Sequence, residues 1–333
     1  MESFSIGVDL GGTNLRAATY SPAAGLSNRR AVPTRIDDGP NAVAEDICRL
    51  ILDAQASGDS DAVCVGVCVG APGPLELPRG RFHQPPNLTG WDGFDLRQIL
   101  ENCLDIPVYL ENDANAAALA ECYLGSGRQL GVDSLSMLSL GTGVGHGIIC
   151  EGRIFHGANG LAGEAGHVTV DPDGELCNCG NRGCLEMFAT SRAIRREAVR
   201  RAASGAPGLA KLLAEREDAS AADVFSLAMT GDVDALSVFD RAGRALGICV
   251  ASLVNTFNPP LVVIAGGVSD AWPLLSPKMF EELELRSYIY RLTKPGSRFE
   301  QQTIVQKAAL GPDAGLTGAA LYPFIYGAHQ ESL

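Results

Sequence analysis

Aromatic and basic residues are both scarce in this chain of 333 residues. Phe, Trp and Tyr together make up 6% of the sequence, whereas glycine occurs 39 times, so many backbone segments can approach closely. Lys and Arg number 26 against 39 Asp and Glu, which gives a formal net charge of −13 at pH 7. This balance argues against a surface for nucleic acid or for an anionic membrane.

Long apolar runs are also missing. No run reaches the ~18 residues of a membrane span, and the opening "MESFSIGVDLGG" has no basic region of the kind that begins a secretory signal. Seven of the ten cysteines are dispersed through apolar or helical contexts, which is typical of reduced, buried thiols rather than of a secreted disulfide framework. They are Cys48, Cys64, Cys68, Cys103, Cys122, Cys150 and Cys249. We therefore expect a cytoplasmic protein that does not bind membranes.

The length suggests about two domains, and short apolar strands alternate with helical patterns along the chain. The predicted strands are 4–10, 15–21, 62–70, 107–113 and 259–269, and the predicted helices include 43–54, 95–104, 114–125 and 314–327. The segment 82–94 is predicted as loop, and the alanine-rich stretch 203–223 as a surface excursion. The last helix is rich in small residues, and we expect it to pack back on the N-terminal half.

A strand, a glycine turn and a second strand occur twice, at 4–21 and at 134–155. No helical pattern follows either turn, as a Walker A loop or a Rossmann fingerprint would require. Two copies of this unit imply a duplicated architecture, with two α/β domains that each carry a hairpin and a cleft between them.

Consecutive N–H groups of a glycine turn can hold a phosphate where a Cβ would collide. Asp9 is suited to hold Mg²⁺ through water, and Thr13 offers a hydroxyl to a phosphate oxygen. Simple hairpin turns are the alternative, but the repeat and a third glycine site after a buried strand favour binding of ATP with Mg²⁺. The predicted nucleotide-binding residues are Asp9, Gly11, Gly12, Thr13, Asn14, Gly141, Thr142, Gly143, Gly266 and Gly267.

Asp113 stands where the strand 107–113 ends and a helix begins. A helix N-terminus favours a carboxylate, so this side chain should stay ionised at neutral pH. An N-cap is the alternative interpretation. However, ligands in α/β folds usually bind at the carboxyl ends of strands, which makes Asp113 a candidate for chemistry.

Three cysteines lie within 177–184, and His167 precedes the first of them by ten residues. Three thiolates and one imidazole form a Cys₃His zinc composition, and four protein ligands leave no open position, so such a metal would be structural. Three cysteines cannot all pair, which argues against a disulfide set. A redox switch and unrelated buried thiols remain alternatives.

Together these motifs resemble the ROK family (repressor, open reading frame, kinase), and in particular its sugar kinases of the bacterial glucokinase type. The resemblance covers nearly the whole chain and rests on "DLGGTNLRA", "GAPGP", "ENDANAAALAE", "LGTGVGHGI", "GEAGH", "CNCGNRGCLE" and "NTFNPPLVVIAGGV". It implies a two-domain α/β fold of the actin-like (ribonuclease H-like) ATPase type. The smaller domain would comprise 1–120 with a C-terminal helix at about 312–333, and the larger 121–311 would carry the zinc motif and the adenosine segment. A homodimer is expected from the same resemblance.

The resemblance also implies an activity, the ATP-dependent phosphorylation of a hexose at its C6 hydroxyl. Glucose is the expected substrate, with Asp113 as the general base. The implied sugar-binding residues are Gly73, Asn87, Asn112, Asp113, Glu164, His167 and Glu186, and the implied zinc ligands are His167, Cys177, Cys179 and Cys184. By fixing the backbone, the metal would hold both glutamates in place. His146 has no assigned role.

Three other functions stay open. The first is a kinase for fructose, mannose or an N-acetylhexosamine. The second is a sugar-responsive repressor, which the same family contains, but such a protein carries a DNA-binding domain before the first hairpin, and here that hairpin begins near residue 9. The third is a zinc-ribbon interaction module, which would leave the duplicated hairpins unexplained.

Overall fold

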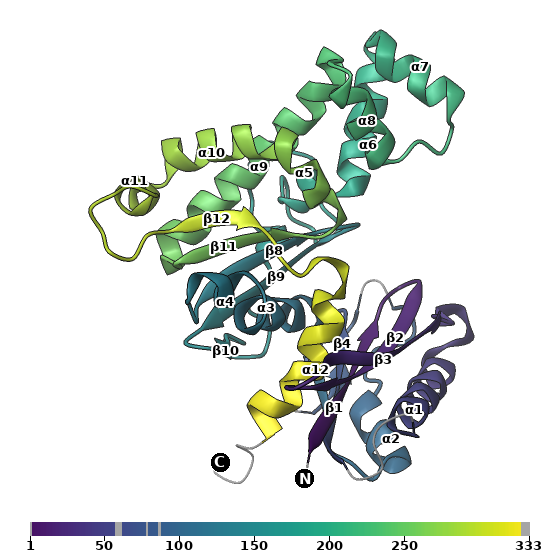
Figure 1. Ribbon diagram of the computed structural model, residues 1–333. Coiled ribbons are helices and arrows are strands. Elements are labelled where there is room, and N and C mark those ends of the chain that lie inside the picture. Colours follow the sequence, from purple (N-terminus) through teal and green to yellow (C-terminus); the bar gives the residue numbers. More distant parts are fainter. Residues whose placement is uncertain (1, 57–61, 78, 86–87, 328–333) are drawn as a thin grey trace. The chain divides into compact units, whose positions relative to one another are not determined.

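The computed structural model describes residues 2–56, 62–77, 79–85 and 88–327 (Figure 1). Packing divides the chain into two compact units. Unit 1 comprises Met1–Asp133, Gly147–Gly163 and Ala309–Leu333, and unit 2 comprises Ser134–His146 and Glu164–Ala308. The expected domains, 1–120 with about 312–333 and 121–311, stay a prediction. The two compact units differ from the expected domains mainly because residues 121–133 and 147–163 pack with unit 1.

Unit 1 is built on a five-stranded sheet with the strand order β3-β2-β1-β4-β7. The strands β1, β2 and β3 are antiparallel, whereas β1, β4 and β7 are parallel. The strands are β1 Ser3–Leu10, β2 Asn14–Ser21, β3 Gly25–Pro33, β4 Val63–Ala71, β7 Val108–Asn112, the short pair β5 Leu75–Glu76 and β6 Arg81–Phe82, and β10 Arg153–Ile154. The helices are α1 Pro40–Ala56, α2 Leu96–Cys103, α3 Asp113–Tyr123, α4 Ser126–Leu130 and α12 Ala314–Tyr326, with single turns η1 Ile36–Asp38 and η4 Gly311–Asp313.

Helices cover both faces of this sheet (Figure 1). On β4, Val67 and Val69 belong to the core that α1 and α2 share with the sheet. Cys68 between them packs in a second cluster with Ala116 of α3 and Ala319 of α12. The alternation of side chains along a strand therefore assigns α1 and α2 to one face and α3 and α12 to the other.

The helix α12 approaches the sheet and α3 closely. A Cβ at Gly7 of β1 would lie 2.5 Å from the backbone nitrogen of Ala320, and a Cβ at Gly318 would lie 1.6 Å from the carbonyl oxygen of Ala116. Only glycine fits at either position. The prediction that the last, small-residue helix packs on the N-terminal half is confirmed.

Unit 2 carries most of the second sheet, whose order is β10-β9-β8-β11-β12. The strands β8, β11 and β12 are parallel, and β11 is buried along its whole length, as is typical of parallel strands. The strands are β8 Leu135–Leu140, β9 Val144–Cys150, within which the chain passes into unit 1, β11 Leu261–Ala265 and β12 Ile304–Lys307. The helices are α5 Glu186–Ala189, α6 Ser191–Ala203, α7 Pro207–Glu215, α8 Ala221–Met229, α9 Val233–Phe257, α10 Trp272–Arg286 and α11 Tyr288–Thr293, with η2 Ala165–His167 and η3 Gly267–Ala271.

Glycines also allow the two long helices of unit 2 to pack closely. Cβ atoms at Gly243 and Gly247 of α9 would each lie 2.4 Å from a carbonyl oxygen of α10. The expected surface excursion at 203–223 contains α7, in which only Leu209 is buried. None of the helices within the described ranges combines the length and the apolar character that a membrane crossing requires.

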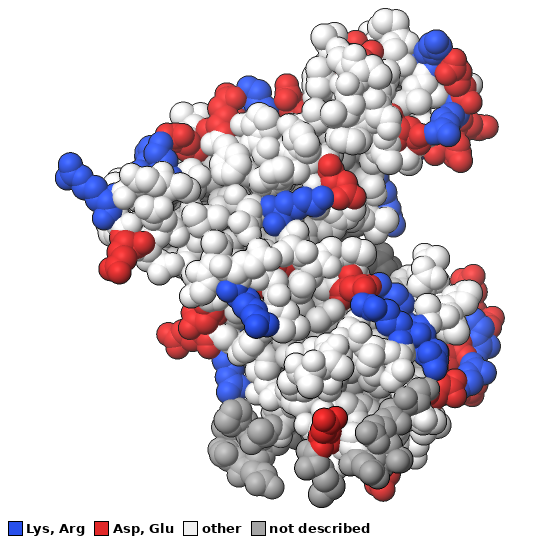
Figure 2. Space-filling model, viewed as in Figure 1, with Lys and Arg blue, Asp and Glu red and all other residues white. Residues whose placement is uncertain are grey.

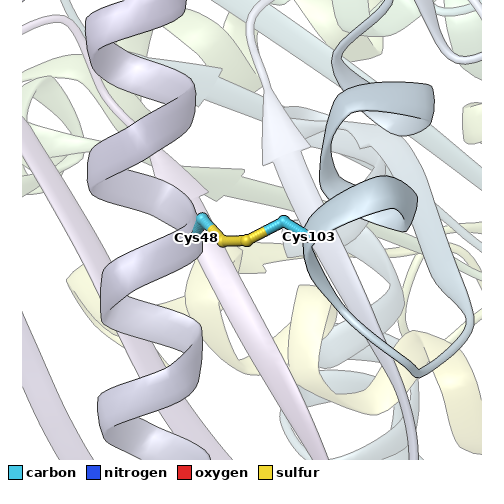
Figure 3. Close-up of a disulfide and its surroundings, with 2 residues drawn as sticks. All are labelled: Cys48 and Cys103. Carbon is cyan, nitrogen blue, oxygen red and sulfur yellow. A yellow bond between two sulfur atoms is a disulfide. The ribbon is translucent and has the colours of Figure 1, made fainter.

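Two cysteines differ from the sequence expectation. Cys48 of α1 and Cys103 of α2 form a disulfide, whereas both were expected to be free thiols (Figure 3). Their Cα atoms are 6.7 Å apart, within the range that a disulfide spans. The expectation was wrong because the packing of α1 against α2 brings together residues 55 positions apart, which no local spacing reveals. Cys150, expected to be buried, is a free and exposed thiol.

The disulfide predicts a redox-dependent stability. In protein purified without reductant, Cys103→Ser should lower the free energy of unfolding by about 2–4 kcal/mol, because the bridge restricts the unfolded chain. Urea unfolding of the wild type with and without dithiothreitol measures the same difference. Cys64→Ser, at a thiol outside the bridge, is the matched control and should leave the redox dependence intact. Equal urea midpoints for wild type in both redox states would contradict the disulfide.

Candidate active site

The two glycine turns have related geometry, although they lie in different units. In unit 1, residues 11–13 join β1 to β2, and the Gly11 N–H donates to the Asn14 carbonyl at 3.1 Å. In unit 2, residues 141–143 join β8 to β9, and the Gly141 N–H donates to the Gly143 carbonyl at 2.9 Å. The predicted duplication of strand, glycine turn and strand is therefore confirmed at the level of secondary structure.

Neighbouring residues fix both turns through their carbonyl groups. Thr34 donates its hydroxyl to the Gly11 carbonyl at 2.8 Å and its N–H to the Thr13 carbonyl at 2.9 Å. The Gly141 carbonyl accepts the Ser191 N–H at 2.9 Å. Thr13 and Thr142 at the turn tips are exposed, so their hydroxyls can reach a ligand.

Two of the predicted nucleotide-binding glycines have no role in the packing of the chain. Cβ atoms at Gly12 and Gly267 would meet nothing within 4 Å, and neither residue has a positive φ. By contrast, Gly266 has φ +81° and a Cβ there would lie 2.4 Å from the Leu140 carbonyl oxygen. Thus Gly266 is required by the fold, whereas Gly12 and Gly267 leave space that a ligand can occupy.

Asp9, the predicted magnesium residue, is paired with an arginine. The β1–β2 register places Arg16 opposite Asp9, and its Nε and Nη2 donate to Asp9 Oδ2 at 2.9 and 2.6 Å. Arg16 also pairs with Asp313 at 3.1 Å. Both contacts to Asp9 are made to Oδ2, so Oδ1 is the oxygen to which a hydrated metal ion would bind. Arg16 was not among the predicted site residues, although the register of the hairpin places it opposite Asp9.

The predicted base and its neighbour lie where β7 ends and α3 begins. Asn112 is the N-cap of α3, and its Oδ1 accepts the N–H groups of Ala114 at 2.9 Å and Asn115 at 3.2 Å. Asp113 is the first residue of α3, is exposed, and accepts the Ala114 N–H at 2.7 Å through Oδ1. The capping role that was the alternative for Asp113 therefore belongs mainly to Asn112.

Gly315, at the start of α12, lies next to both predicted acidic residues of unit 1. A Cβ at this position would be 3.7 Å from Asp9 Oδ1 and 3.9 Å from the Asp113 carbonyl oxygen. The first glycine turn and the Asn112–Asp113 corner, about a hundred residues apart in the chain, thus meet at one point. Gly315 lies in a helix with no polar signature, so no local pattern indicates its role.

Gly73, predicted to bind sugar, lies beside Asn112. A Cβ at Gly73 would lie 3.3 Å from Asn112 Nδ2. Since Oδ1 of Asn112 caps α3, Nδ2 is the group that can donate to a ligand. Asn87, predicted from the neighbouring loop, lies outside the described residues.

In unit 2 the two predicted sugar-binding glutamates lie near one another and near the second turn. Glu186 Oε2 accepts the Val144 N–H at 3.1 Å. The pKa of Glu164 is raised above its usual value, chiefly because the carboxyl group is partly buried. The carboxylate of Glu186 also raises this pKa, whereas His167 lowers it. The proximity of two carboxylates makes this region suited to accept hydrogen bonds from hydroxyl groups.

The predicted zinc ligands also come together in unit 2. One ligand atom from each of His167, Cys177, Cys179 and Cys184 lies within 4.8 Å of the others. Cys177 Sγ is 3.7 Å from His167 Nδ1, and Cys179 Sγ is 3.7 Å from Cys184 Sγ. The backbone holds this loop through the Cys177 N–H, which donates to the Asn181 carbonyl at 2.7 Å. The donor set and its spacing fit a tetrahedral zinc ion.

His146, which follows the second turn, is a buried core residue. Its Nε2 lies 2.8 Å from Ser136 Oγ on the neighbouring strand, and burial lowers its pKa to about 4. The imidazole is therefore neutral at physiological pH.

Comparisons with known proteins place these features in context. The model of the ROK family matches residues 5–323. A glucokinase from Halalkalibacterium halodurans is 38% identical over 94% of this chain and 92% of its own length. The crystal structure of a ROK hexokinase from Thermus thermophilus has 34% identity and a TM-score of 0.79, and covers 98% of this chain and 99% of that one. The crystal structure of a ROK family glucokinase from Streptomyces griseus in complex with glucose and AMPPNP has 32% identity and a TM-score of 0.77. It covers 96% of this chain and 98% of that one. The family resemblance and the α/β fold predicted from the sequence are confirmed.

Proposed function

Because the chain belongs to the ROK family, we propose that it is an ATP-dependent hexose kinase that converts glucose to glucose 6-phosphate. The observation that carries the proposal is the meeting of Asp9 and Asp113 at Gly315. The side chain of Asp9, suited to hold a hydrated Mg²⁺ ion, and the backbone carbonyl of Asp113, the proposed base, thus flank one glycine in unit 1. Phosphoryl transfer requires these two functions close together.

The chemistry assigned to unit 1 is simple. Asp113 accepts the proton of the C6 hydroxyl as O6 forms its bond to the γ-phosphorus and the bond from that phosphorus to the bridging oxygen of ADP breaks. The position of Asp113 in the first turn of α3 favours its ionised form. Asn112 Nδ2 donates to a neighbouring sugar hydroxyl, and the Gly73 loop lies against it. When bound, Mg²⁺ would neutralise phosphate charge, and Asp9 is the residue that would hold it through water.

The remaining sugar and nucleotide assignments follow from the family resemblance. We assign Glu164, His167 and Glu186 to hexose binding, and the turns of residues 11–14 and 141–143 with Gly266 and Gly267 to ATP binding. His167 Nδ1 faces Cys177, so its Nε2 is the nitrogen that can meet a hydroxyl. Zinc held by the Cys₃His cluster would fix the backbone that carries Glu164 and Glu186. Asn87 is retained as a sugar contact from the sequence alone.

We also propose a cytoplasmic homodimer that binds neither nucleic acid nor membranes. The net charge of −13 argues against binding to nucleic acid or anionic membranes, and acidic and basic side chains are interspersed on the face that Figure 2 draws. The homodimer and the location follow from the family resemblance. A kinase for another hexose is the alternative, since these residues would hold most pyranoses. A repressor is the weaker alternative, and tight binding to an operator DNA would favour it.

The proposed function is tested by an assay that measures ADP release from ATP and Mg²⁺ in the presence of each of a panel of hexoses. Asp113→Ala is the key variant. We expect glucose to be the best substrate. Loss of the base should lower kcat by about 10²- to 10⁴-fold while the fold, measured by circular dichroism, is retained. Asp95→Ala is the matched control, because Asp95 caps α2 in the same unit and should cost only stability. Near-normal kcat in Asp113→Ala would contradict the assignment of the base.

Gly12→Ala tests the nucleotide assignment. Since the added Cβ meets no protein atom, the melting temperature should not change, whereas KM for ATP should rise about 10- to 100-fold through lost phosphate contacts. KM for the hexose serves as the internal control and should stay within about threefold. An unchanged KM for ATP would show that this turn only connects two strands.

Zinc analysis tests the metal. Protein purified without chelators should contain one zinc per chain, and removal of the metal should lower the melting temperature, because binding of a structural metal contributes to folding. Cys184→Ser should lose the metal, whereas Cys122→Ser, at a buried cysteine of unit 1, should retain it. Less than about half an equivalent in the wild type would count against a structural site.

A further inference from the structure

A buried carboxylate lies immediately before the Asn112–Asp113 corner. Glu111, the penultimate residue of β7, has a fully buried side chain with 0% of its surface exposed. A carboxylate is strongly disfavoured in such a place unless hydrogen bonds and an opposite charge compensate for the loss of water. Its partners should therefore be specific, and all of those described below belong to unit 1.

Glu111 joins three parts of unit 1 through one carboxylate. Its Oε1 accepts the backbone N–H of Asn112 at 2.8 Å and the Nδ2 group of Asn115, in the first turn of α3, at 2.9 Å. Its Oε2 lies 2.7 Å from His156 Nε2, which comes from the loop after β10. The end of β7, the start of α3 and this loop are thus fixed to one another.

His156 is itself held in place. Its side chain is 29% exposed. Its carbonyl accepts the Ala162 N–H at 3.1 Å, which closes the loop of residues 156–162. Burial lowers the pKa of His156, but the hydrogen bond and the negative charge of Glu111 outweigh this and raise it above its ordinary value. The contact is therefore a charge-assisted hydrogen bond in the protonated state.

We propose that Glu111 and His156 are positioning residues for Asp113, a role that rests on the proposed kinase function. The backbone of Asn112 is held at its N–H by Glu111, and the next residue is the base. Asn115, in the first turn of α3, is held by the same oxygen. Loss of this anchor would let the corner shift, and a shift of about 1 Å in a catalytic group can lower the rate about 100-fold.

A second buried carboxylate provides the matched control. Glu121, further along α3, is also 0% exposed and accepts the backbone N–H groups of Ser126 at 3.0 Å and Leu310 at 2.7 Å. It braces the same helix, but none of these bonds reaches Asn112 or Asp113. A purely structural role for buried glutamates predicts equal effects on kcat at the two positions, whereas positioning predicts an effect only at Glu111.

The test compares His156→Ala, His156→Gln, Glu111→Gln and Glu121→Gln, each assayed well below its melting temperature. We expect His156→Ala and Glu111→Gln to lower kcat about 10- to 100-fold, with KM for hexose and ATP within about threefold. His156→Gln can still donate an N–H to Glu111 and should recover most of kcat. Glu121→Gln should lower the melting temperature with kcat unchanged. If Glu111→Gln does not fold, the partly exposed His156 carries the comparison.

The outcomes separate this inference from the proposed function. An active wild type in which His156→Ala keeps kcat within twofold would overturn the positioning role and leave the kinase function standing. An equal fall of kcat in Glu121→Gln and His156→Ala would also overturn it, because general loosening of α3 would then explain both. A wild type without hexose kinase activity, or a fully active Asp113→Ala, would overturn the assigned chemistry and the positioning role together.

Discussion

The close contact of α12 with β1 and α3 is the constraint on which the unit 1 site depends. A methyl group at Gly318 would overlap the Ala116 carbonyl, and one at Gly7 would overlap the backbone of α12. Because these contacts are backbone to backbone, the helix can take only one position on the sheet. That position brings Gly315 beside Asp9 and Asp113, so the last helix of the chain defines the geometry around its first strand.

The three acidic residues around this site, Asp9, Glu111 and Asp113, differ in burial and in their hydrogen-bond partners. Asp9 is half-buried and accepts two hydrogen bonds from Arg16 through Oδ2, while Glu111 has both oxygens bonded within the fold. Asp113, between a buried glutamate and a helix start, is exposed. Paired carboxylates in the interior and one exposed carboxylate at a strand end are an arrangement that keeps stability and reactivity on different residues.

The sequence predicted those features that depend on local pattern. The hairpins, the buried strand β11, the strand-to-helix junction at Asp113 and the gathering of the Cys₃His residues follow from periodicity, glycine position and ligand spacing. The edge strand β3 was missed because its side chains are mostly half-exposed or exposed and it has no apolar alternation. Other features depend on tertiary packing between distant segments, and no local pattern carries that information. They are the Cys48–Cys103 disulfide, the position of Gly315 and the Glu111–His156 pair.

In unit 2 the Cys₃His cluster, a carboxylate and a glycine turn are linked through one short stretch of chain and one hydrogen bond. Cys184 precedes Glu186 by two residues, Glu186 begins α5, and its Oε2 accepts the N–H of Val144 directly after the turn. A phosphate bound at this turn would bring a second negative charge close to that carboxylate, which is unfavourable unless other donors approach it. Hydroxyl groups of a sugar are such donors. With both proposed roles, sugar bound at Glu186 would favour phosphate at the turn, and the two substrates would be coupled through a single side chain next to the Cys₃His cluster.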